Sequence, residues 1–400
     1  MTTAVSVELD ASQIVALDAV SAWLAARLTD PKQSQVFRVG GHAGSGKTTI
    51  IKEVLARFPD LKIAVTTFTG KASEVLRGKG VEQAINLHQI FYMPDPVKLA
   101  EKAVLEHDLE TAAPENRQPI RDLIQRLNAE LFVRVETVPF DLVIVDEATM
   151  VPGRITEDLL RFGVPVLAVG DPAQLPPVET NVYLEPLFAD QEIDAMLTGS
   201  HRHRGGSLLA EVADAARHDR GLPAEVIVTD PDLTEYDAIL VFTNDCRWRT
   251  IKTVRQQLGK PVDAPIPGDT IMVQRNDQKL MVFNGSTLTI ATVERAWEVK
   301  HALRITTTDG DQLLIDARGF TEAGLREALR HPAKGAVVAS FCEAITVHKA
   351  QGSEWPRVLV AQDHSRVGSR EDRVRWRYTA VTRAQEAVHV VGASFLRPVI

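Results

Sequence analysis

The segment GHAGSGKT, residues 41–48, follows the apolar run QVFRV and precedes TIIKEVLARF, which has the pattern of a helix. It matches G-x-x-x-x-G-K-[ST] in the strand, loop and helix context that a phosphate-binding loop requires. Glycines let backbone N–H groups curl around phosphate oxygens, and the start of the helix adds a favourable dipole. The segment therefore predicts a nucleotide site in which Lys47 reaches the β- and γ-phosphates and the Thr48 hydroxyl binds Mg²⁺. Its candidate nucleotide-binding residues are Gly41, Gly44, Ser45, Gly46, Lys47, Thr48 and Thr49.

A second segment, FDLVIVDEATM at residues 140–150, ends an apolar strand pattern with Asp146 and Glu147. An apolar strand that ends in two acidic residues is common by chance, but downstream of a P-loop it indicates a catalytic site. Asp146 suits the binding of Mg²⁺, and Glu147 suits a general base that orients water for attack on the γ-phosphate. The pair predicts hydrolysis of a nucleotide rather than its storage. No N-K-x-D guanine-specificity motif occurs, which disfavours a GTPase and leaves ATP as the expected nucleotide.

The composition is that of a globular chain of 400 residues, 44% hydrophobic and 24% charged. At about 100–200 residues per domain, this length predicts two to four domains. Lys and Arg number 45 against 53 Asp and Glu, and the net charge of −8 excludes a globally basic coat protein but allows a local basic groove. Two cysteines, Cys246 and Cys342, exclude a disulfide scaffold and a four-cysteine zinc site. With no secretory pattern and no membrane-spanning run, we expect a reduced, cytoplasmic setting.

The first part of the chain alternates helix and strand patterns, which predicts α/β units around a parallel sheet. We expect a helix over residues 11–27 and strands at QVFRV, IAVTTF, DLVIVD and VPVLAVG. Residues 93–130 interrupt this rhythm with a passage rich in proline and charge. The spacing of an amphipathic helix occurs within it, at Ile120, Leu123, Ile124, Leu127 and Leu131.

From about residue 200 a second α/β pattern begins, with AILVFTN as a strand and residues 247–258 as a helix. Residues 262–320 instead alternate polar and apolar positions, and Asn284-Gly285 and Asp309-Gly310 favour the tight turns of hairpins. This predicts a small β-barrel inserted into the second α/β domain. The domain resumes with PRVLVAQD and closes with AVHVVGAS.

Further strings follow the P-loop in a fixed order. Taken alone, AVGDPAQLPPV at 168–178 is as readily a proline-bearing turn, but the set together resembles the motifs of superfamily 1 helicases. The resemblances are FTGKA (68–72) to motif Ia, AVGDPAQLPPV to motif III, LTGSHRH (197–203) to motif IV, AITVHKAQGSEW (344–355) to motif V and YTAVTRAQ (378–385) to motif VI. LDASQ (9–13) is similar to the glutamine motif, and INLHQIF (85–91) to a T-[IL]-H string of RecD-like and Dda-like helicases.

The resemblance covers residues 9–395 and, by motif wording, is to the RecD/Dda-like, 5′→3′ branch of the superfamily. It implies two RecA-like domains, over 1–197 and 198–400. The first carries the insertion 93–130, and the second an SH3-like barrel at about 259–340. Three features depart from the branch: Asn86 replaces the usual Thr, Phe68 stands where Pro is frequent, and 93–130 has a helical pattern where Dda-like members carry a β-hairpin wedge.

The resemblance also implies roles for single residues. Gln13 reads adenine, Gln174 contacts the γ-phosphate, and Gly352 and Glu354 belong to the nucleotide site. Arg202 and Arg383 act from the second domain as catalytic arginines, although each is open to the alternative of an ordinary surface arginine. Single-stranded nucleic acid is contacted by Phe68, Thr69, His88, Thr346 and His348. The two histidines are also open to a purely structural role.

We therefore expect an ATP-dependent 5′→3′ DNA helicase or translocase that needs ATP and Mg²⁺. Its partners would be single-stranded DNA and duplex junctions, with replication or recombination proteins as further partners, and the chain would be monomeric. We expect residues 93–130 to separate the strands. An ATP-gated remodeller of nucleic-acid complexes and an RNA helicase stay open as alternatives. A small-molecule kinase is disfavoured by motifs V and VI and by the complete second domain.

Overall fold

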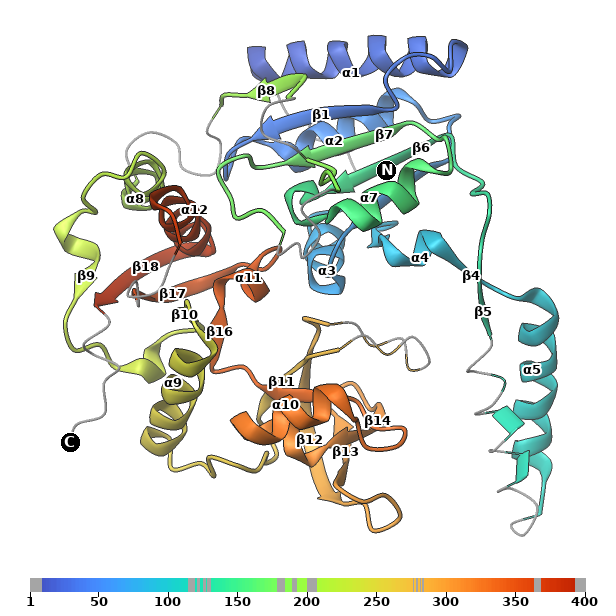
Figure 1. The fold of residues 1–400 in the computed structure, drawn as a ribbon, viewed down its shortest axis with the longest axis vertical. Helices are drawn as coiled ribbons and strands as arrows, with labels where there is room; N and C mark the ends of the chain where they lie inside the picture. The colour runs from blue at the N-terminus through green and yellow to red at the C-terminus, as the bar shows by residue number, and fades with distance from the viewer. Residues whose placement is uncertain are drawn as a thin grey trace, which may run out of the picture.

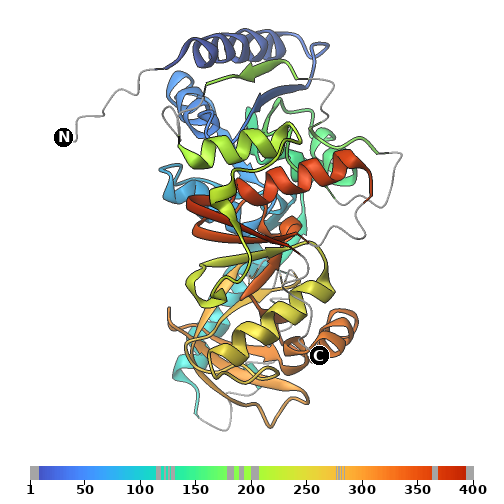
Figure 2. The ribbon, with the colours of Figure 1, turned by 90° about the vertical axis from the view of Figure 1, so that its left-hand side faces the viewer.

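The computed structural model describes residues 9–113, 119–120, 123–124, 127, 131–177, 184–188, 193–199, 207–275, 277, 280, 282, 284–362 and 368–392. This part of the chain forms two parallel sheets, a five-stranded antiparallel sheet and a two-stranded ribbon. The two parallel sheets and the antiparallel sheet follow one another along the long axis, as both ribbon views show (Figures 1 and 2). The predicted α/β fold with parallel sheets is confirmed. No helix in the described ranges has the length and apolar character that a bilayer crossing requires.

Six parallel strands form the first sheet, in the order β3-β2-β6-β7-β1-β8. Their bounds are β1 (Val36–Gly41), β2 (Ile63–Thr67), β3 (Ile85–Asn86), β6 (Leu142–Asp146), β7 (Val166–Gly170) and β8 (Ala195–Leu197). The four strands predicted in this region are therefore present, as β1, β2, β6 and β7. Both faces are buried: Leu142 and Ile144 of β6 pack into one apolar cluster, and Val143 and Val145 pack into another.

Helices cover both faces of this sheet. One apolar cluster is completed by α1 (Ala11–Thr29), α2 (Lys47–Arg57) and α3 (Gly70–Gly78). The other is completed by α4 (His88–Phe91) and α7 (Gly153–Leu160), and the short helix η2 (Ala148–Met150) follows β6. The helix predicted over 11–27 is α1, which begins with a capping box between Asp10 and Gln13.

The insertion 93–130 rises from a β-ribbon that the sequence did not predict. Strand β4 (Tyr92–Pro94) pairs antiparallel with β5 (Phe132–Arg134), and α5 (Pro96–Thr111) follows β4. Of the helix predicted around residues 120–131, the structure describes Leu131, which lies in a bend outside any helix, and residues 119–120, 123–124 and 127, which have helical backbone. The prediction of helix was right for these residues and for α5. It was wrong in leaving out strand pairing at the base, where the insertion joins the first sheet's helices (Figure 1).

The second parallel sheet has the order β16-β10-β17-β18-β9. Its strands are β9 (Ile227–Val228), β10 (Ala238–Val241), β16 (Ala344–Thr346), β17 (Trp355–Gln362) and β18 (Ala384–Gly392). The predicted strands AILVFTN, PRVLVAQD and AVHVVGAS appear as β10, β17 and β18. The helical elements of this part are α8 (Leu208–Arg217), η3 (Ala224–Val226), η4 (Leu233–Glu235), α9 (Asn244–Gln257), α11 (Val347–Ala350) and α12 (Arg370–Val381).

An antiparallel sheet, in the order β14-β13-β12-β11-β15, is inserted between α9 and β16. Its elements are β11 (Thr270–Val273), β12 (Thr287–Arg295), β13 (Ala302–Thr307), β14 (Gln312–Asp316), η5 (Ala317–Phe320), α10 (Glu322–Arg330) and β15 (Ala339–Phe341). Gly285 and Gly310 have φ of 89° and 92°, as the predicted turns require. A single parallel bridge between Ile315 and Val337 links β14 to the segment before β15. Full closure into an SH3-like barrel stays a prediction, while β15 and α10 were missed.

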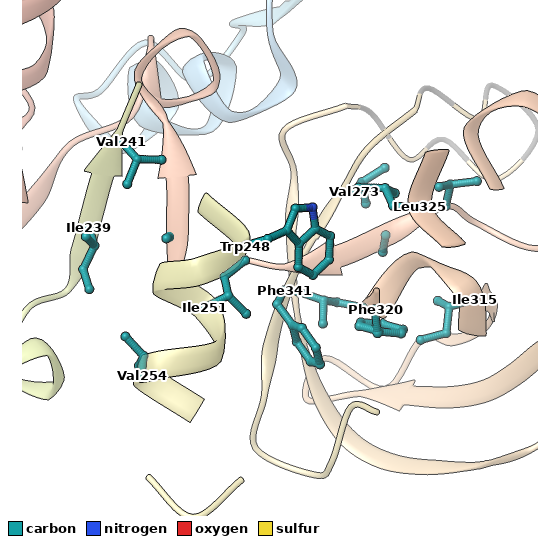
Figure 3. Close-up of a cluster of buried hydrophobic side chains, with 14 of the residues drawn as sticks. Ile239, Val241, Trp248, Ile251, Val254, Val273, Ile315, Phe320, Leu325 and Phe341 are labelled. Carbon is teal, nitrogen blue, oxygen red and sulfur yellow. The ribbon is translucent and has the colours of Figure 1, made fainter. Parts of the chain in front are cut away.

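The inserted sheet shares one core with the second parallel sheet. A continuous cluster runs from Ile239 of β10 through Trp248 of α9 to Val273, Phe320 and Phe341 of the insertion (Figure 3). A buried ion pair supports this junction: Arg255 of α9 contacts Asp269 at 2.8 Å, and both side chains are at most 1% exposed. The inserted sheet and the second parallel sheet therefore form one packed unit, which we call the second body, and the first sheet with its helices is the first body.

Candidate functional site

Three loops meet at the carboxyl edge of the first sheet because β6, β7 and β1 are parallel neighbours. The P-loop follows β1, the acidic pair Asp146–Glu147 ends β6, and Asp171 follows β7. Gly46 caps α2 with φ 88°, a left-handed conformation that favours glycine. The ammonium of Lys47 donates hydrogen bonds to the carbonyls of Gly41 (2.7 Å) and His42 (3.1 Å), so the lysine lies across its own loop.

A cavity of about 310 Å³ opens beside this loop and is lined from both parallel sheets. It brings together most of the residues predicted for nucleotide binding and catalysis. Its lining residues are Ala43, Gly44, Ser45, Gly46, Lys47, Thr48, Lys79, Asp146, Glu147, Gln174, Glu354 and Arg383. Lys79 is the charged member of this set that the sequence analysis missed, because it lies outside every recognised motif.

The acidic pair at the end of β6 is electrostatically perturbed. Burial, and then the neighbouring charge of Glu147, raise the pKa of Asp146 to about 6, while Lys47 acts in the opposite direction. Glu147 itself has a φ of 52°, a left-handed conformation that is uncommon for a residue with a side chain. Such backbone strain is typical of functional sites. The strained turn directs two neighbouring carboxylates toward the P-loop cavity.

Several buried oxygens at this cavity have no hydrogen-bond partner. They are Ser45 Oγ, Asp146 Oδ1, Glu147 Oε2 and Gln174 Oε1. Unpaired buried polar atoms are rare and costly, so their clustering indicates a place for a ligand. Thr48 and Asp146 supply the oxygen donors that Mg²⁺ prefers. No group of three or more His, Cys, Asp or Glu residues able to hold a metal occurs in the described ranges.

The loop after β7 is held by elements of the second sheet. The backbone N–H of Leu175 donates to Thr379 Oγ1 of α12 at 2.9 Å. Arg375 donates to the carbonyls of Pro172 (3.0 Å) and Gln174 (3.2 Å). These bonds place Gln174 in the cavity and tie its position to α12.

A buried tyrosine completes this connection. The hydroxyl of Tyr378 donates to Asp171 Oδ2 at 2.8 Å and accepts the backbone N–H of Ala43 at 3.1 Å. His42 Nδ1 lies 3.2 Å from the other oxygen of Asp171. Burial pushes the pKa of Asp171 upward, but the hydrogen bonds from His42 and Tyr378 together with the nearby charges, Lys47 first among them, leave that pKa below its usual value. The P-loop, the loop after β7 and α12 therefore form one polar network, which the sequence did not predict.

Arg383 faces the P-loop from the second sheet, as motif VI predicted. Its side chain is almost fully buried, with 3% exposure. The guanidinium donates to the carbonyls of Thr379 (3.1 Å) and Ser353 (3.4 Å) and to Thr382 Oγ1 (3.3 Å). Within the described ranges no carboxylate pairs with it, so its positive charge is available to the cavity. Arg202, the other predicted arginine, lies outside the described residues.

Some predicted residues lie around the cavity rather than in its lining. Gln13 is buried under the P-loop: its Oε1 accepts the Asp10 N–H at 3.0 Å and its Nε2 lies 3.4 Å from the Ser45 carbonyl. A role for Gln13 in reading adenine stays a prediction. Gly41, Thr49 and Gly352 also lie outside the lining.

A second cavity, of about 240 Å³, lies between the first sheet, the inserted sheet and α11. We call it the strand groove. Its lining residues are Phe68, Thr69, Met150, Pro152, Pro177, Asn284, Gly285, His348, Lys349 and Gln351. Three of the five predicted nucleic-acid contacts line it, namely Phe68, Thr69 and His348. Lys349 belongs to the predicted motif V and Asn284-Gly285 to a predicted turn, but neither was predicted to line this groove.

The other two predicted contacts, His88 and Thr346, are not among the lining residues of the groove. His88 packs on Phe68 with ring centroids 5.6 Å apart, and Thr346 is 8% exposed. Burial lowers the pKa of His88, as it lowers that of His348. Asn86, which departs from the family pattern, accepts the His88 N–H at 2.9 Å. The same oxygen lies 3.1 Å from His88 Nδ1, so Asn86 holds both the backbone and the ring of His88.

Two family profiles match the chain. The AAA domain profile matches residues 22–229, and the UvrD-like helicase C-terminal domain profile matches residues 341–391. The chain is also similar to the RecBCD enzyme subunit RecD of Mycolicibacterium smegmatis, with 27% identity over 88% of this chain and 67% of that protein. It is similar to the ATP-dependent RecD2 DNA helicase of Deinococcus radiodurans, with 26% identity over 92% of this chain and 49% of that protein. The chain thus spans about half to two thirds of the length of these relatives.

Solved structures of Pif1 helicases have a similar fold. One, from a study of two Pif1 helicases unwinding forked duplex DNA, has a TM-score of 0.56 at 17% identity and covers 97% of this chain and 93% of that one. A Bacteroides Pif1 helicase in complex with ADP-AlF3 and single-stranded DNA has a TM-score of 0.54 at 17% identity, covering 96% and 92%. At 17% identity these structures show a similar fold and no more, and the similarity extends over nearly the whole chain.

Proposed function

Because the chain belongs to the AAA-domain family and to the RecD-like branch of the superfamily 1 helicases, we propose that it is an ATP-dependent DNA helicase. It uses ATP hydrolysis to move 5′→3′ along single-stranded DNA and to open duplexes. The observation that carries this proposal is the cavity that places Lys47, Asp146 and Glu147 of one sheet opposite Arg383 of the other. A nucleotide bound there contacts both bodies, so its hydrolysis alters how they are held together.

Each residue around the cavity has a separate role in ATP hydrolysis. Backbone N–H groups of the P-loop and the Lys47 ammonium hold the phosphates, while Thr48 and Asp146 hold Mg²⁺. When bound, Mg²⁺ neutralises charge on the phosphate oxygens. Glu147 accepts a proton from the attacking water. Arg383 stabilises the charge that develops on the transferred phosphoryl group, because a guanidinium donates several hydrogen bonds at once.

The strand groove supports the proposed nucleic-acid substrate. Thr69 and His348 reach the groove from opposite parallel sheets, and Lys349 adds a cation. Hydroxyl, imidazole and ammonium groups suit phosphates and sugars, which position a strand without reading its sequence. Asn284 and Gly285 of the inserted sheet complete the wall, so closing the nucleotide cavity moves both walls of the groove relative to each other.

The proposed helicase has RecA-like domains over 1–197 and 198–400, and the inserted sheet serves as an SH3-like module. The segment 93–130 separates the strands, because the ribbon β4–β5 and α5 form the one sizeable insertion among the described residues of the first domain. We further propose that the protein works in the cytoplasm as a monomer and meets replication or recombination proteins there. Arg202 acts as a further catalytic arginine from the second domain, as the resemblance to motif IV implies.

The test is ATP turnover with and without single-stranded DNA. We expect DNA to stimulate hydrolysis, Lys47→Ala to abolish it, and Glu147→Gln to bind ATP yet turn it over slowly. Glu157→Gln is the matched control, because Glu157 is an exposed residue of α7 whose partner is Arg161. Equal turnover with and without DNA would overturn the proposal. Stimulation without unwinding would favour the ATP-gated remodeller.

A further inference from the structure

A lysine outside every motif connects the two bodies at the mouth of the nucleotide cavity. Lys79 follows the C-terminal end of α3, and its ammonium lies 3.2 Å from Glu354 Oε1 on the loop before β17. Gln385 of β18 donates to the other oxygen of Glu354 at 3.2 Å. Lys79 lines the same cavity as Lys47 and Arg383. It is therefore a third cation around the place where the phosphates bind.

The helix that carries Lys79 reaches from one cavity to the other. Thr69 caps the start of α3 by accepting the Ala72 N–H at 3.2 Å, and it lines the strand groove. Lys79 caps the other end and lines the nucleotide cavity. The nine residues of α3 span about 13 Å at 1.5 Å per residue. Because a short helix moves as a unit, a displacement at Lys79 also displaces Thr69.

The loop of the second body touches α3 at both ends. A Cβ atom on Gly352 would lie 2.7 Å from the Cβ of Ala72 and 3.3 Å from Thr69 Oγ1. Two residues further along this loop, Glu354 pairs with Lys79. The contact near Thr69 is steric, and the loop can approach α3 there because Gly352, with φ 76°, carries no side chain. The contact at Lys79 is ionic, and an ion pair can exchange partners.

We propose that Lys79 is a terminal-phosphate sensor of the ATPase, which pairs with Glu354 when no nucleotide is bound and with the γ-phosphate when ATP is bound. This inference rests on the proposed ATP site. The Lys79 side chain is 41% exposed, so its pair with Glu354 is largely solvated and weak. A γ-phosphate carries more charge than a carboxylate and has more acceptor oxygens, so it outcompetes Glu354 for the ammonium. Binding of ATP then releases the Glu354 loop from α3, and phosphate loss restores the pair.

The experiment measures binding of a non-hydrolysable ATP analogue and of ADP, each with Mg²⁺, by fluorescence titration. For Lys79→Ala we expect about a tenfold weaker affinity for the analogue, the lower range for a hydrogen bond between charged groups, with ADP affinity within about twofold of wild type. Lys79→Arg should recover most of the loss. Lys52→Ala is the matched control, since Lys52 of α2 is exposed and lies beside Gly80, outside the cavity lining.

Two results would overturn the sensor. One is a Lys79→Ala variant that weakens the analogue and ADP equally, or neither. The other is a Glu354→Gln variant that lowers the preference for the analogue as much as Lys79→Ala does, since the ion pair itself would then carry the effect. A thermal melt within 2 °C of wild type shows that Lys79→Ala is folded. If wild type binds neither nucleotide, the proposed ATPase fails instead, so the two failures are distinguishable.

Discussion

Replacing Tyr378 by Phe removes one buried oxygen from the junction between the P-loop, Asp171 and α12. The ring stays in place, and the tyrosine is only 2% exposed. The lost oxygen donates to Asp171 Oδ2 at 2.8 Å and accepts from Ala43 N at 3.1 Å. The first bond joins residues 207 positions apart, one in the loop after β7 and the other in α12. The substitution therefore weakens the contact between the two bodies without changing either core.

The size of the effect follows from these two bonds. A hydrogen bond to a charged group contributes about 1.5–3 kcal/mol and a neutral one about 1 kcal/mol. Asp171 keeps His42 and the Ala173 N–H as partners, so its carboxylate is not left unpaired. Ala43 lines two cavities, where water can replace the lost acceptor. We therefore expect a loss of about 2–3 kcal/mol in the free energy of unfolding, with most of it from the bond to Asp171.

Urea unfolding followed by tryptophan fluorescence measures this loss, because the buried Trp376 lies two residues away on α12. The matched control is Tyr236→Phe, which removes a 2.8 Å bond to His389 within the second body. The control should cost about 1 kcal/mol or less, since that bond involves no carboxylate and is partly exposed. A Tyr378→Phe protein within about 0.5 kcal/mol of wild type, or one no less stable than the control, would refute the reasoning.

Three further predictions concern the cavity and the insertion. Arg383→Ala should lower kcat for ATP by about 10³-fold while ATP binding changes little, because arginines of this kind act mainly on the transition state; near-normal kcat in steady-state kinetics would remove Arg383 from the site. Asp146→Asn should stabilise the nucleotide-free protein above pH 6. The pKa of Asp146 is about 6 in the folded protein and 3.8 ordinarily, so the free energy of unfolding of wild type falls as the pH rises from about 4 to 6. The asparagine does not ionise, so the variant avoids this loss. Thermal melts at pH 4 and pH 7 should show this dependence in wild type and a flatter one in the variant, and identical slopes would contradict the assignment. Joining Pro94 to Phe132 through a Gly/Ser linker should leave DNA-stimulated ATPase intact and abolish unwinding of a 5′-tailed duplex; undiminished unwinding would place the strand separator elsewhere.

That most of the candidate nucleotide-binding residues line one cavity could be predicted, because their motifs are local in sequence. Lys47 and Thr48 sit in an eight-residue pattern, and Asp146 and Glu147 directly end a strand. The order of strands β6, β7 and β1 then brings these segments to one edge. Arg383 could be predicted only through the family resemblance, since nothing in its own neighbourhood indicates a role across a cavity.

Features that depend on distant pairing could not be predicted in this way. The strands β4 and β5 have three residues each and are separated by the whole insertion, so they show no recognisable period. Lys79 belongs to no motif, and its role depends on Glu354, which lies 275 positions away. Tyr378 was quoted within motif VI, but its contact with Asp171 depends on the packing of one body on the other. In each case tertiary structure supplies the partner.

The central claim is that ATP hydrolysis between the two bodies drives 5′→3′ movement along DNA and separates strands. The direct measurement is ATP-dependent unwinding of matched duplexes that carry a single-stranded tail at either the 5′ or the 3′ end. The account predicts displacement from the 5′-tailed duplex, none from the 3′-tailed duplex, and none by Lys47→Ala on either. Unwinding of only the 3′-tailed duplex would contradict the assigned direction, and wild-type protein that hydrolyses ATP but opens neither duplex would contradict the helicase itself.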